Sequence, residues 1–219
     1  MIEIKNLKKS YIIGENESLV LKWINLSVEK WDFITIMWPS WSWKSTLMNI
    51  IWILDTPSSW EYYFDWIDTA KLSWIEQANF RRDKIWFVFQ WYNLLPRLQA
   101  WKQVALPLSY KWVGFLKRKQ IAIKKLKELW LEDKINFTPD MLSWWQQQRV
   151  CIARALVCDP LLILADEPTW ALDSKNGKEL LELFVELNKN WRTIIMITHD
   201  RDVAAYSKKI INIKDWLII

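Results

Sequence analysis

Short apolar runs alternate with segments of helical periodicity along most of this chain. Four runs are apolar enough to be buried strands: Phe33–Met37, Ile85–Gln90, Leu161–Ala165 and Thr193–Ile197. Segments 47–54, 117–131, 143–158 and 175–190 have the apolar spacing of helices. Strands that alternate with helices predict a mostly parallel sheet covered on both faces, which is the α/β class.

The two ends of the chain and its middle depart from this alternation. Residues 1–37 read as strands with a polar hairpin-like loop at Gly14–Ser18, and residues 55–84 read as turns followed by a helix. Short strands are predicted again near 210–213 and 217–219. Residues 91–142 contain prolines between helical segments and read as a helical insert. Its basic segment, 117–131, is interpreted as a solvated face and not as a nucleic-acid site.

Length and composition set wide bounds on the class of protein. The 219 residues fit one domain, and the net charge of +5 does not choose among nucleotide, membrane surface and nucleic acid as partners. No apolar run reaches the roughly eighteen residues of a membrane span, and the start lacks a secretory pattern, so a cytoplasmic protein is expected. Cys151 and Cys158 are expected to be reduced core residues.

The stretch from residue 38 to residue 46, WPSWSWKST, has the layout of a phosphate-binding loop. It lies between a predicted strand and a predicted helix, and it ends in Lys44, Ser45 and Thr46. In such loops backbone N–H groups surround phosphate oxygens, the lysine binds the β- and γ-phosphates, and the hydroxyl binds Mg²⁺. Here Trp38, Trp41 and Trp43 occupy positions that need glycine for positive φ and close approach, and an indole would fill the phosphate space.

The amounts of tryptophan and glycine suggest an explanation. The chain has 19 Trp and 3 Gly, whereas average usage predicts roughly fifteen glycines. Many tryptophans also lie in dipeptides typical of turns, such as Asp65-Trp66 and Asn190-Trp191. We hypothesise that one codon, UGA, specifies glycine in the source and is read here as tryptophan. The alternative is a genuinely Trp-rich core, whose tryptophans would follow strand or helix periodicity.

Several polar residues follow the predicted strands at their carboxyl ends. Asp166 and Glu167 follow one strand, His199 follows another, and Gln90 ends a third. Parallel α/β sheets bind ligands at this edge, where an acid can hold Mg²⁺ and its neighbour can orient or deprotonate water. Taken alone, an acid pair can equally be a solvated turn, and a lone histidine is commonly structural. Ser143 is a natural N-cap for the following helix.

With tryptophan read as glycine, the chain resembles the ATP-binding subunits of ABC transporters over nearly its whole length. The motifs occur in the order and spacing of that family: the phosphate loop 38–46, Gln90, the signature Leu142–Gln146, Leu162–Thr169, Trp170–Ser174 and Ile197–Asp200. The segments 54–57, 92–96 and 106–108 are similar to the branch that serves lipoprotein release and macrolide export. The resemblance implies a RecA-like P-loop NTPase fold in one domain, 1–219, with an N-terminal antiparallel β subdomain and a helical subdomain at about 91–142.

The resemblance also implies roles for individual residues and for partners. Tyr11 would stack on adenine, with a strand-end core aromatic as the alternative. Glu167 would be the general base, with His199 and Gln90 as further catalytic residues, and Ser45, Gln90 and Asp166 would hold Mg²⁺. ATP would also contact residues of the loop, the signature and the following turn: Trp38, Ser40, Trp41, Ser42, Trp43, Lys44, Ser45, Thr46, Ser143, Trp144, Trp145, Gln146 and Asp173. Two subunits would bind ATP head to tail, with the insert facing a transmembrane permease at the inner face of the membrane.

Three classes of function stay open at this stage. The first is an ATPase that powers a separate permease, and the second is an ABC ATPase that regulates a membrane complex without transport. The third is a nucleotide-dead binding module, which real tryptophans at positions 38, 41, 43, 144, 145 and 170 would require. Soluble ABC proteins of translation or repair are disfavoured, because they carry paired cassettes or long coiled-coil insertions.

Overall fold

The molecule is built on two sheets. The computed structural model describes residues 1–14, 16–37, 44–90, 92–214 and 217–218. The larger sheet has the strand order β10-β9-β3-β8-β7-β6 and is parallel from β9 to β6, whereas β10 is antiparallel to β9. Its strands are β3 (Phe33–Met37), β6 (Ile85–Val88), β7 (Leu162–Asp166), β8 (Thr193–Thr198), β9 (Lys209–Lys214) and β10 (Leu217–Ile218).

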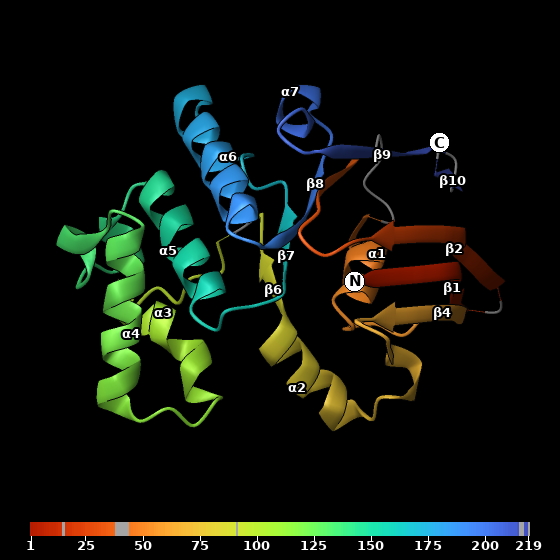
Figure 1. Ribbon diagram of the computed structural model, residues 1–219, viewed down its shortest axis with the longest axis horizontal. Coiled ribbons are helices and arrows are strands. Elements are labelled where there is room, and N and C mark those ends of the chain that lie inside the picture. Colours follow the sequence, from red (N-terminus) through yellow and green to blue (C-terminus); the bar gives the residue numbers. More distant parts are fainter. Residues whose placement is uncertain (15, 38–43, 91, 215–216, 219) are drawn as a thin grey trace.

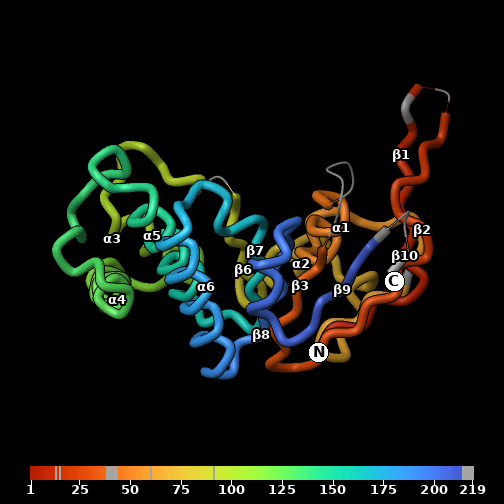
Figure 2. Tube along the Cα trace, turned by 90° about the horizontal axis from the view of Figure 1, so that it is seen from above, coloured from red at the N-terminus to blue at the C-terminus, as the bar shows by residue number. Residues whose placement is uncertain are grey.

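The smaller sheet is antiparallel and has the order β2-β1-β4-β5. Its strands are β1 (Ile2–Ile13), β2 (Asn16–Val28), β4 (Ser59–Phe64) and β5 (Ile67–Asp68). In Figure 2 the outer part of the β1–β2 hairpin projects from the body of the molecule. The strand β4 was not predicted, because residues 55–84 read as turns followed by a helix. Its pairing with β1, from Ile2↔Phe64 to Lys8↔Ser59, is what makes it a strand.

Helices cover the parallel sheet and extend to one side of it. Figure 1 shows α3, α4 and α5 grouped at one end of the molecule and the antiparallel sheet at the other. The helices are α1 (Lys44–Ile51), α2 (Trp74–Lys84), α3 (Ala100–Ser109), α4 (Phe115–Glu128), α5 (Trp144–Leu156), α6 (Ser174–Lys189) and α7 (Arg201–Ala204). Short 3-10 turns lie at Thr69–Lys71, Glu132–Lys134 and Pro139–Met141.

The strands of the parallel sheet send alternate side chains into two apolar cores. In β8, Ile194 and Met196 join the core under α3 to α6, whereas Ile195 and Ile197 join the core shared with α1 and the antiparallel sheet. Because side chains of a strand alternate between its faces, continuous apolar runs are what a sheet buried on both sides requires. The predicted fold class is confirmed.

The ends of two helices, α1 and α5, differ from the predicted ends. The first helix begins at Lys44 and not near residue 47, so the lysine lies in its first turn. Helix α5 ends at Leu156, and Cys158 therefore lies beyond it. Cys151 and Cys158 are buried free thiols, as expected. Burial raises the pKa of Cys151 to about 12, which keeps this thiol protonated.

Candidate active site

The central feature of the site is an ion pair between the first helix and a strand end. Lys44 Nζ lies 2.6 Å from Asp166 Oδ1 and 3.6 Å from Glu167 Oε1. Lys44 begins α1, and Asp166 is the last residue of β7. Both side chains are largely buried, so their attraction is weakly screened. The lysine of the predicted phosphate loop and the predicted acid pair are thus brought together.

Glu167 is held from several directions. Its Oε2 accepts a hydrogen bond from Thr198 Oγ1 at 2.9 Å, and its Oε1 accepts one from the His199 backbone N–H at 3.2 Å. The ring atom His199 Nδ1 lies 2.7 Å from the same Oε1. Glu167 is 5% exposed and has a φ of 44°, a conformation that costs free energy in a residue other than glycine. The backbone N–H of Glu167 donates to Ile197 O, which fixes this conformation against β8.

Burial raises the pKa of Asp166, and the Lys44 ammonium offsets part of that shift. The nearby Glu167 charge acts in the same direction as burial. A cation that replaced Lys44 beside Asp166 would therefore be attracted by a carboxylate that is poorly solvated. A divalent metal ion is one such cation.

The residues expected to hold Mg²⁺ supply suitable atoms. Ser45 is exposed in the first turn of α1, directly after Lys44, and offers a hydroxyl oxygen. Gln90 is half-buried and lies two residues beyond Val88, the last residue of β6. Val88 pairs with Ala165 of β7, and Glu167 lies two residues beyond Ala165. Gln90 and Glu167 therefore hold equivalent places after two paired strands. Carboxylate, hydroxyl and amide oxygens are hard ligands of the type that Mg²⁺ takes. Within the described ranges, no group of three or more His, Cys, Asp or Glu side chains could hold a metal ion.

Tyr11 lies near the outer end of β1 and is 38% exposed, so it is not a core residue. Its hydroxyl donates to Asp55 Oδ2 at 2.8 Å. Burial raises the pKa of Tyr11, and its contact with Thr46 in the first turn of α1 opposes this shift. The predicted adenine-stacking residue therefore neighbours the helix that begins at Lys44.

The signature and the turn after β7 form two helix starts. Ser143 caps α5 in a capping box, with its Oγ accepting from Gln146 N at 3.3 Å and Gln146 Oε1 accepting from Ser143 N at 3.0 Å. Asp173 caps α6, where Oδ1 accepts from Asn176 N at 2.9 Å. Hydrogen bonds from the backbone and the side chain of Asn176 hold the pKa of Asp173 below its usual value. In this one chain Ser143 and Asp173 make these bonds within their own helices.

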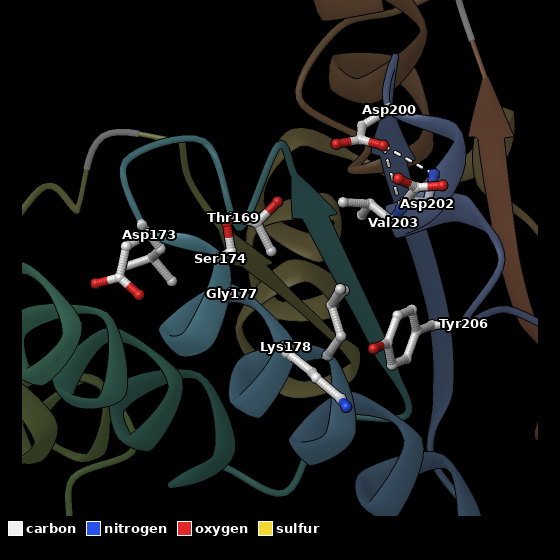
Figure 3. A pocket seen from close by; sticks show the side chains of 11 residues that line it. Thr169, Asp173, Ser174, Gly177, Lys178, Asp200, Asp202, Val203 and Tyr206 are labelled. Carbon is white, nitrogen blue, oxygen red and sulfur yellow. Dashed lines mark hydrogen bonds between the residues drawn. The ribbon is translucent and has the colours of Figure 1, made fainter.

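A pocket of about 380 Å³ opens between the start of α6 and α7. Figure 3 shows Asp173 and Lys178 on one wall and Asp202 and Tyr206 on the other. Asp200, which follows His199, caps α7 through hydrogen bonds from Asp202 N and Val203 N. The pocket is thus lined by Asp173, in the turn before α6, and by Asp200, the residue after His199.

The predicted loop residues Trp38, Ser40, Trp41, Ser42 and Trp43 lie outside the described residues. At the signature, the Trp144 side chain is 60% exposed, and the Trp145 ring packs 4.1 Å from the Arg149 guanidinium carbon. Trp170, in the turn after β7, is also exposed. Trp144 and Trp170 are therefore accommodated at the surface, whereas Trp145 is half-buried and packs against the core under α3 to α6.

Backbone conformation separates the tryptophans into groups. Among the described residues, twelve other than glycine have positive φ, and half of them are tryptophan. These six are Trp23, Trp31, Trp66, Trp112, Trp130 and Trp191, with φ between 51° and 71°, and all are exposed. A bulky side chain rarely adopts this conformation, which is the usual place of glycine. Trp101 differs, because it is helical, 6% exposed and donates from Nε1 to Gln99.

Sequence reasoning missed Thr198 and Asp55. Thr198 ends β8, and its hydroxyl donates a hydrogen bond to Glu167. Asp55 lies in the turn after α1, and its carboxylate accepts a hydrogen bond from the Tyr11 hydroxyl. A threonine directly before the histidine at a strand end was the available signal for the first. Asp55 gave no comparable signal, because its contact partner is 44 residues away.

A parallel sheet with a lysine, two acids and a histidine at its carboxyl edge defines a class of nucleotide-hydrolysing α/β proteins. Residues 21–170 match the family described as ABC transporter. The chain belongs to the ABC transporter family, and its fold is that of an ATPase cassette.

Individual relatives agree with this membership. The ABC transporter ATP-binding protein YvrO of Bacillus subtilis is 48% identical over 98% of this chain and 94% of its own length. The ABC transporter ATP-binding protein MJ0796 of Methanocaldococcus jannaschii is 46% identical over 98% of this chain and 94% of its own length. The macrolide export ATP-binding/permease protein MacB of Bdellovibrio bacteriovorus is 44% identical over the whole chain, which spans 33% of MacB.

A solved structure gives the same result. The dimeric post-hydrolysis state of MJ0796 bound to ADP and Pi superposes with a TM-score of 0.89 at 45% identity. The match covers 100% of this chain and 96% of that one. In the described part of this chain, no helix is both long and apolar enough to span a membrane.

Proposed function

We propose that this chain is an ATP-hydrolysing subunit that drives a separate membrane permease, for export or lipoprotein release. The observation that carries the proposal is the cluster at the strand ends, in which Lys44 pairs with Asp166 while Glu167 contacts His199. Relatives of similar length are described as ATP-binding proteins of ABC transporters, and MacB as an ATP-binding/permease protein. In the cell the chain would lie at the inner face of the membrane.

The cluster would perform hydrolysis through three residues. Lys44 exchanges Asp166 for the β- and γ-phosphate oxygens when ATP binds. Glu167 accepts a hydrogen bond from the attacking water or takes its proton, because its carboxylate is buried and fixed in position. His199 directs Nδ1 at Glu167, which leaves Nε2, on the other side of the ring, for the γ-phosphate. Mg²⁺ would be held by Ser45, Gln90 and Asp166, and would neutralise phosphate charge.

Glycine at the tryptophan positions is part of this proposal. We infer that the native protein carries glycine at positions 38, 41, 43, 144, 145 and 170, and we call the protein with these six glycines the glycine form. The six exposed tryptophans with positive φ support this inference at other sites in the chain. With these glycines, the loop 38–46 and the signature at Ser143 can approach phosphates closely.

Two copies of the chain would enclose ATP head to tail. Ser143 and Gln146 of one subunit would act on ATP held by Lys44 of the other, because the start of α5 can bind an anion. Asp173 would lie at the contact between the two sites, beside the pocket of Figure 3. The related MJ0796 structures are described as dimeric, which supports this arrangement.

The helical region provides a place for the permease. A groove of about 210 Å³ between α3 and α4 has an apolar floor that includes Trp101 and Phe115, and Lys102 and Arg118 line its edge. A cytoplasmic helix with an apolar tip and acidic flanks would complement this surface. Gln90 follows β6, the strand that pairs with β7, and would connect permease contact to the nucleotide.

Mass spectrometry of the natively expressed protein tests the proposal first. Peptides that contain Lys44 and Ser143 would show glycine at positions 38, 41, 43, 144 and 145, and the glycine form would hydrolyse ATP. Native tryptophan at these positions would contradict the glycine inference. A glycine form that neither binds nor hydrolyses Mg-ATP would contradict the ATPase assignment.

A further inference from the structure

A side-chain cluster connects the outer end of β1 to the turn after α1. Asp55 Oδ2 accepts the Tyr11 hydroxyl at 2.8 Å, and Asp55 Oδ1 lies 2.7 Å from Lys9 Nζ. Lys9 Nζ also donates to Thr56 O at 2.7 Å and lies 4.7 Å from the centre of the Tyr11 ring. One carboxylate thus fixes both the hydroxyl of Tyr11 and the ammonium beside its ring.

The turn that contains Asp55 also secures the backbone of β1. Ser58 N donates to Lys8 O at 2.9 Å, and Ser10 N donates to Ser58 Oγ at 3.1 Å. The ladder between β1 and β4 ends at Lys8↔Ser59, so beyond this point β1 pairs in the sheet with β2. Figure 2 shows this part of the hairpin projecting from the body. Contacts from the turn 55–58 therefore set where Tyr11 lies relative to α1.

We propose that Asp55 is a positioning residue that holds the Tyr11 ring where the adenine base stacks. The turn follows directly after α1, which begins at Lys44, so the same helix links the phosphate end of the site to the base end. A ring fixed before the ligand arrives loses less conformational entropy on binding than a freely rotating one. This inference rests on the proposed function, because it takes ATP as the ligand.

The charge state of Asp55 agrees with a role in holding Tyr11 at neutral pH. Burial alone would raise the pKa of Asp55, but hydrogen bonds from Lys9 and Tyr11 outweigh burial and hold the pKa below its usual value. Asp55 is therefore ionised at neutral pH. The Lys9 side chain is 10% exposed, so this pair is partly shielded from solvent and from salt.

Binding measurements on variants of the glycine form test the proposal. Asp55→Ala should weaken Mg-ATP binding about threefold to tenfold by calorimetry, through loss of one charge-assisted hydrogen bond to the stacking residue. Tripolyphosphate, which has no base, should bind Asp55→Ala and the parent equally. The KM for ATP should rise while kcat changes little. Glu61→Gln, an exposed carboxylate of β4 in the same sheet, is the matched control and should bind ATP like the parent.

A double-mutant cycle separates positioning from general damage to the fold. Tyr11→Phe keeps the ring and removes the hydroxyl. Asp55→Ala should then cost less ATP affinity than it does in the parent, because only the contact of Asp55 with Lys9 remains to be lost. Additive losses, unchanged ATP affinity in Asp55→Ala, or equal weakening of tripolyphosphate would each overturn the proposal. A parent that binds tripolyphosphate but not ATP would overturn this inference together with the proposed function. If the parent binds Mg-ATP and Asp55→Ala binds it with the same affinity, this inference alone is overturned.

Discussion

The Oε1 atom of Glu167 lies 2.7 Å from Nδ1 of His199, although 32 residues separate them in the chain. The two residues follow neighbouring parallel strands, β7 and β8, and the ladder between these strands brings them together. Thr198 and the His199 backbone complete the hydrogen bonds to the same carboxylate. The relationship fixes the orientation of the proposed base before any water or nucleotide is present.

Replacement of Glu167 by glutamine should separate binding from hydrolysis. In the glycine form, Glu167→Gln should retain Mg-ATP and lower kcat roughly a hundred- to ten-thousandfold, since an amide cannot accept the proton. Trapped ATP should hold two subunits together in size-exclusion chromatography. Glu182→Gln, an exposed position of α6, serves as the control. Turnover at the parental rate in Glu167→Gln would remove this residue from the mechanism.

Loss of the Thr198 hydroxyl should impair turnover more than binding. Thr198→Val keeps the side-chain shape but removes the donor to Glu167 Oε2, so the carboxylate can leave its position. We expect kcat to fall roughly tenfold with little change in KM for ATP. Thr193→Val, at the other end of the same strand, should leave kcat unchanged. Equal effects of the two substitutions would point to a defect of the strand and not of the site.

Removal of Lys44 should abolish tight nucleotide binding. Lys44→Ala deletes the ammonium that would bind the β- and γ-phosphates, and we expect Mg-ATP affinity to fall roughly a hundredfold. Lys189→Ala, at the exposed end of α6, is the control, because it removes the same charge away from the site. The assignment of the phosphate loop would be wrong if, by calorimetry, Lys44→Ala bound Mg-ATP as tightly as the parent and Lys189→Ala do.

Stability should distinguish tryptophans that stand for glycine from genuine ones. In the chain as printed, Trp112→Gly should raise the free energy of unfolding by about 1 kcal/mol, because Trp112 is 93% exposed and has a φ of 57°. Trp101→Gly should lower it by about 3–5 kcal/mol through loss of buried apolar contacts in α3. Urea unfolding measures both changes. A destabilised Trp112→Gly would remove the structural support for glycine at this position.

The Lys9–Asp55 pair should contribute to stability in a defined range of pH. The folded-state pKa of Asp55 is depressed, so its contribution is present above the unfolded-state value near 3.8 and is lost as pH falls through the folded-state pKa. Asp55→Asn keeps the shape and removes the charge. Its melting temperature should lie below that of the parent at neutral pH, and the difference should shrink at acidic pH. A difference that does not change with pH would contradict the assignment of charge to this pair.

The sequence by itself determined the α/β class and the order of the chemical groups. Apolar runs of strand length report burial on both faces, because the period of a strand is a local property of the chain. The same local reasoning placed Asp166, Glu167 and His199 at strand ends. It also exposed the tryptophan and glycine imbalance, which composition alone reveals. The roles of these residues in ATP hydrolysis stay predictions.

Only the tertiary structure decided which of these groups meet. The pairing of β7 with β8 brings His199 and Thr198 to Glu167, and the pairing of β1 with β4 creates a strand that the local sequence does not show. The contact between Tyr11 and Asp55 depends on the same antiparallel sheet and on the end of α1. Strand register and side-chain contacts between distant segments depend on the packing of the whole chain, and no local pattern contains them.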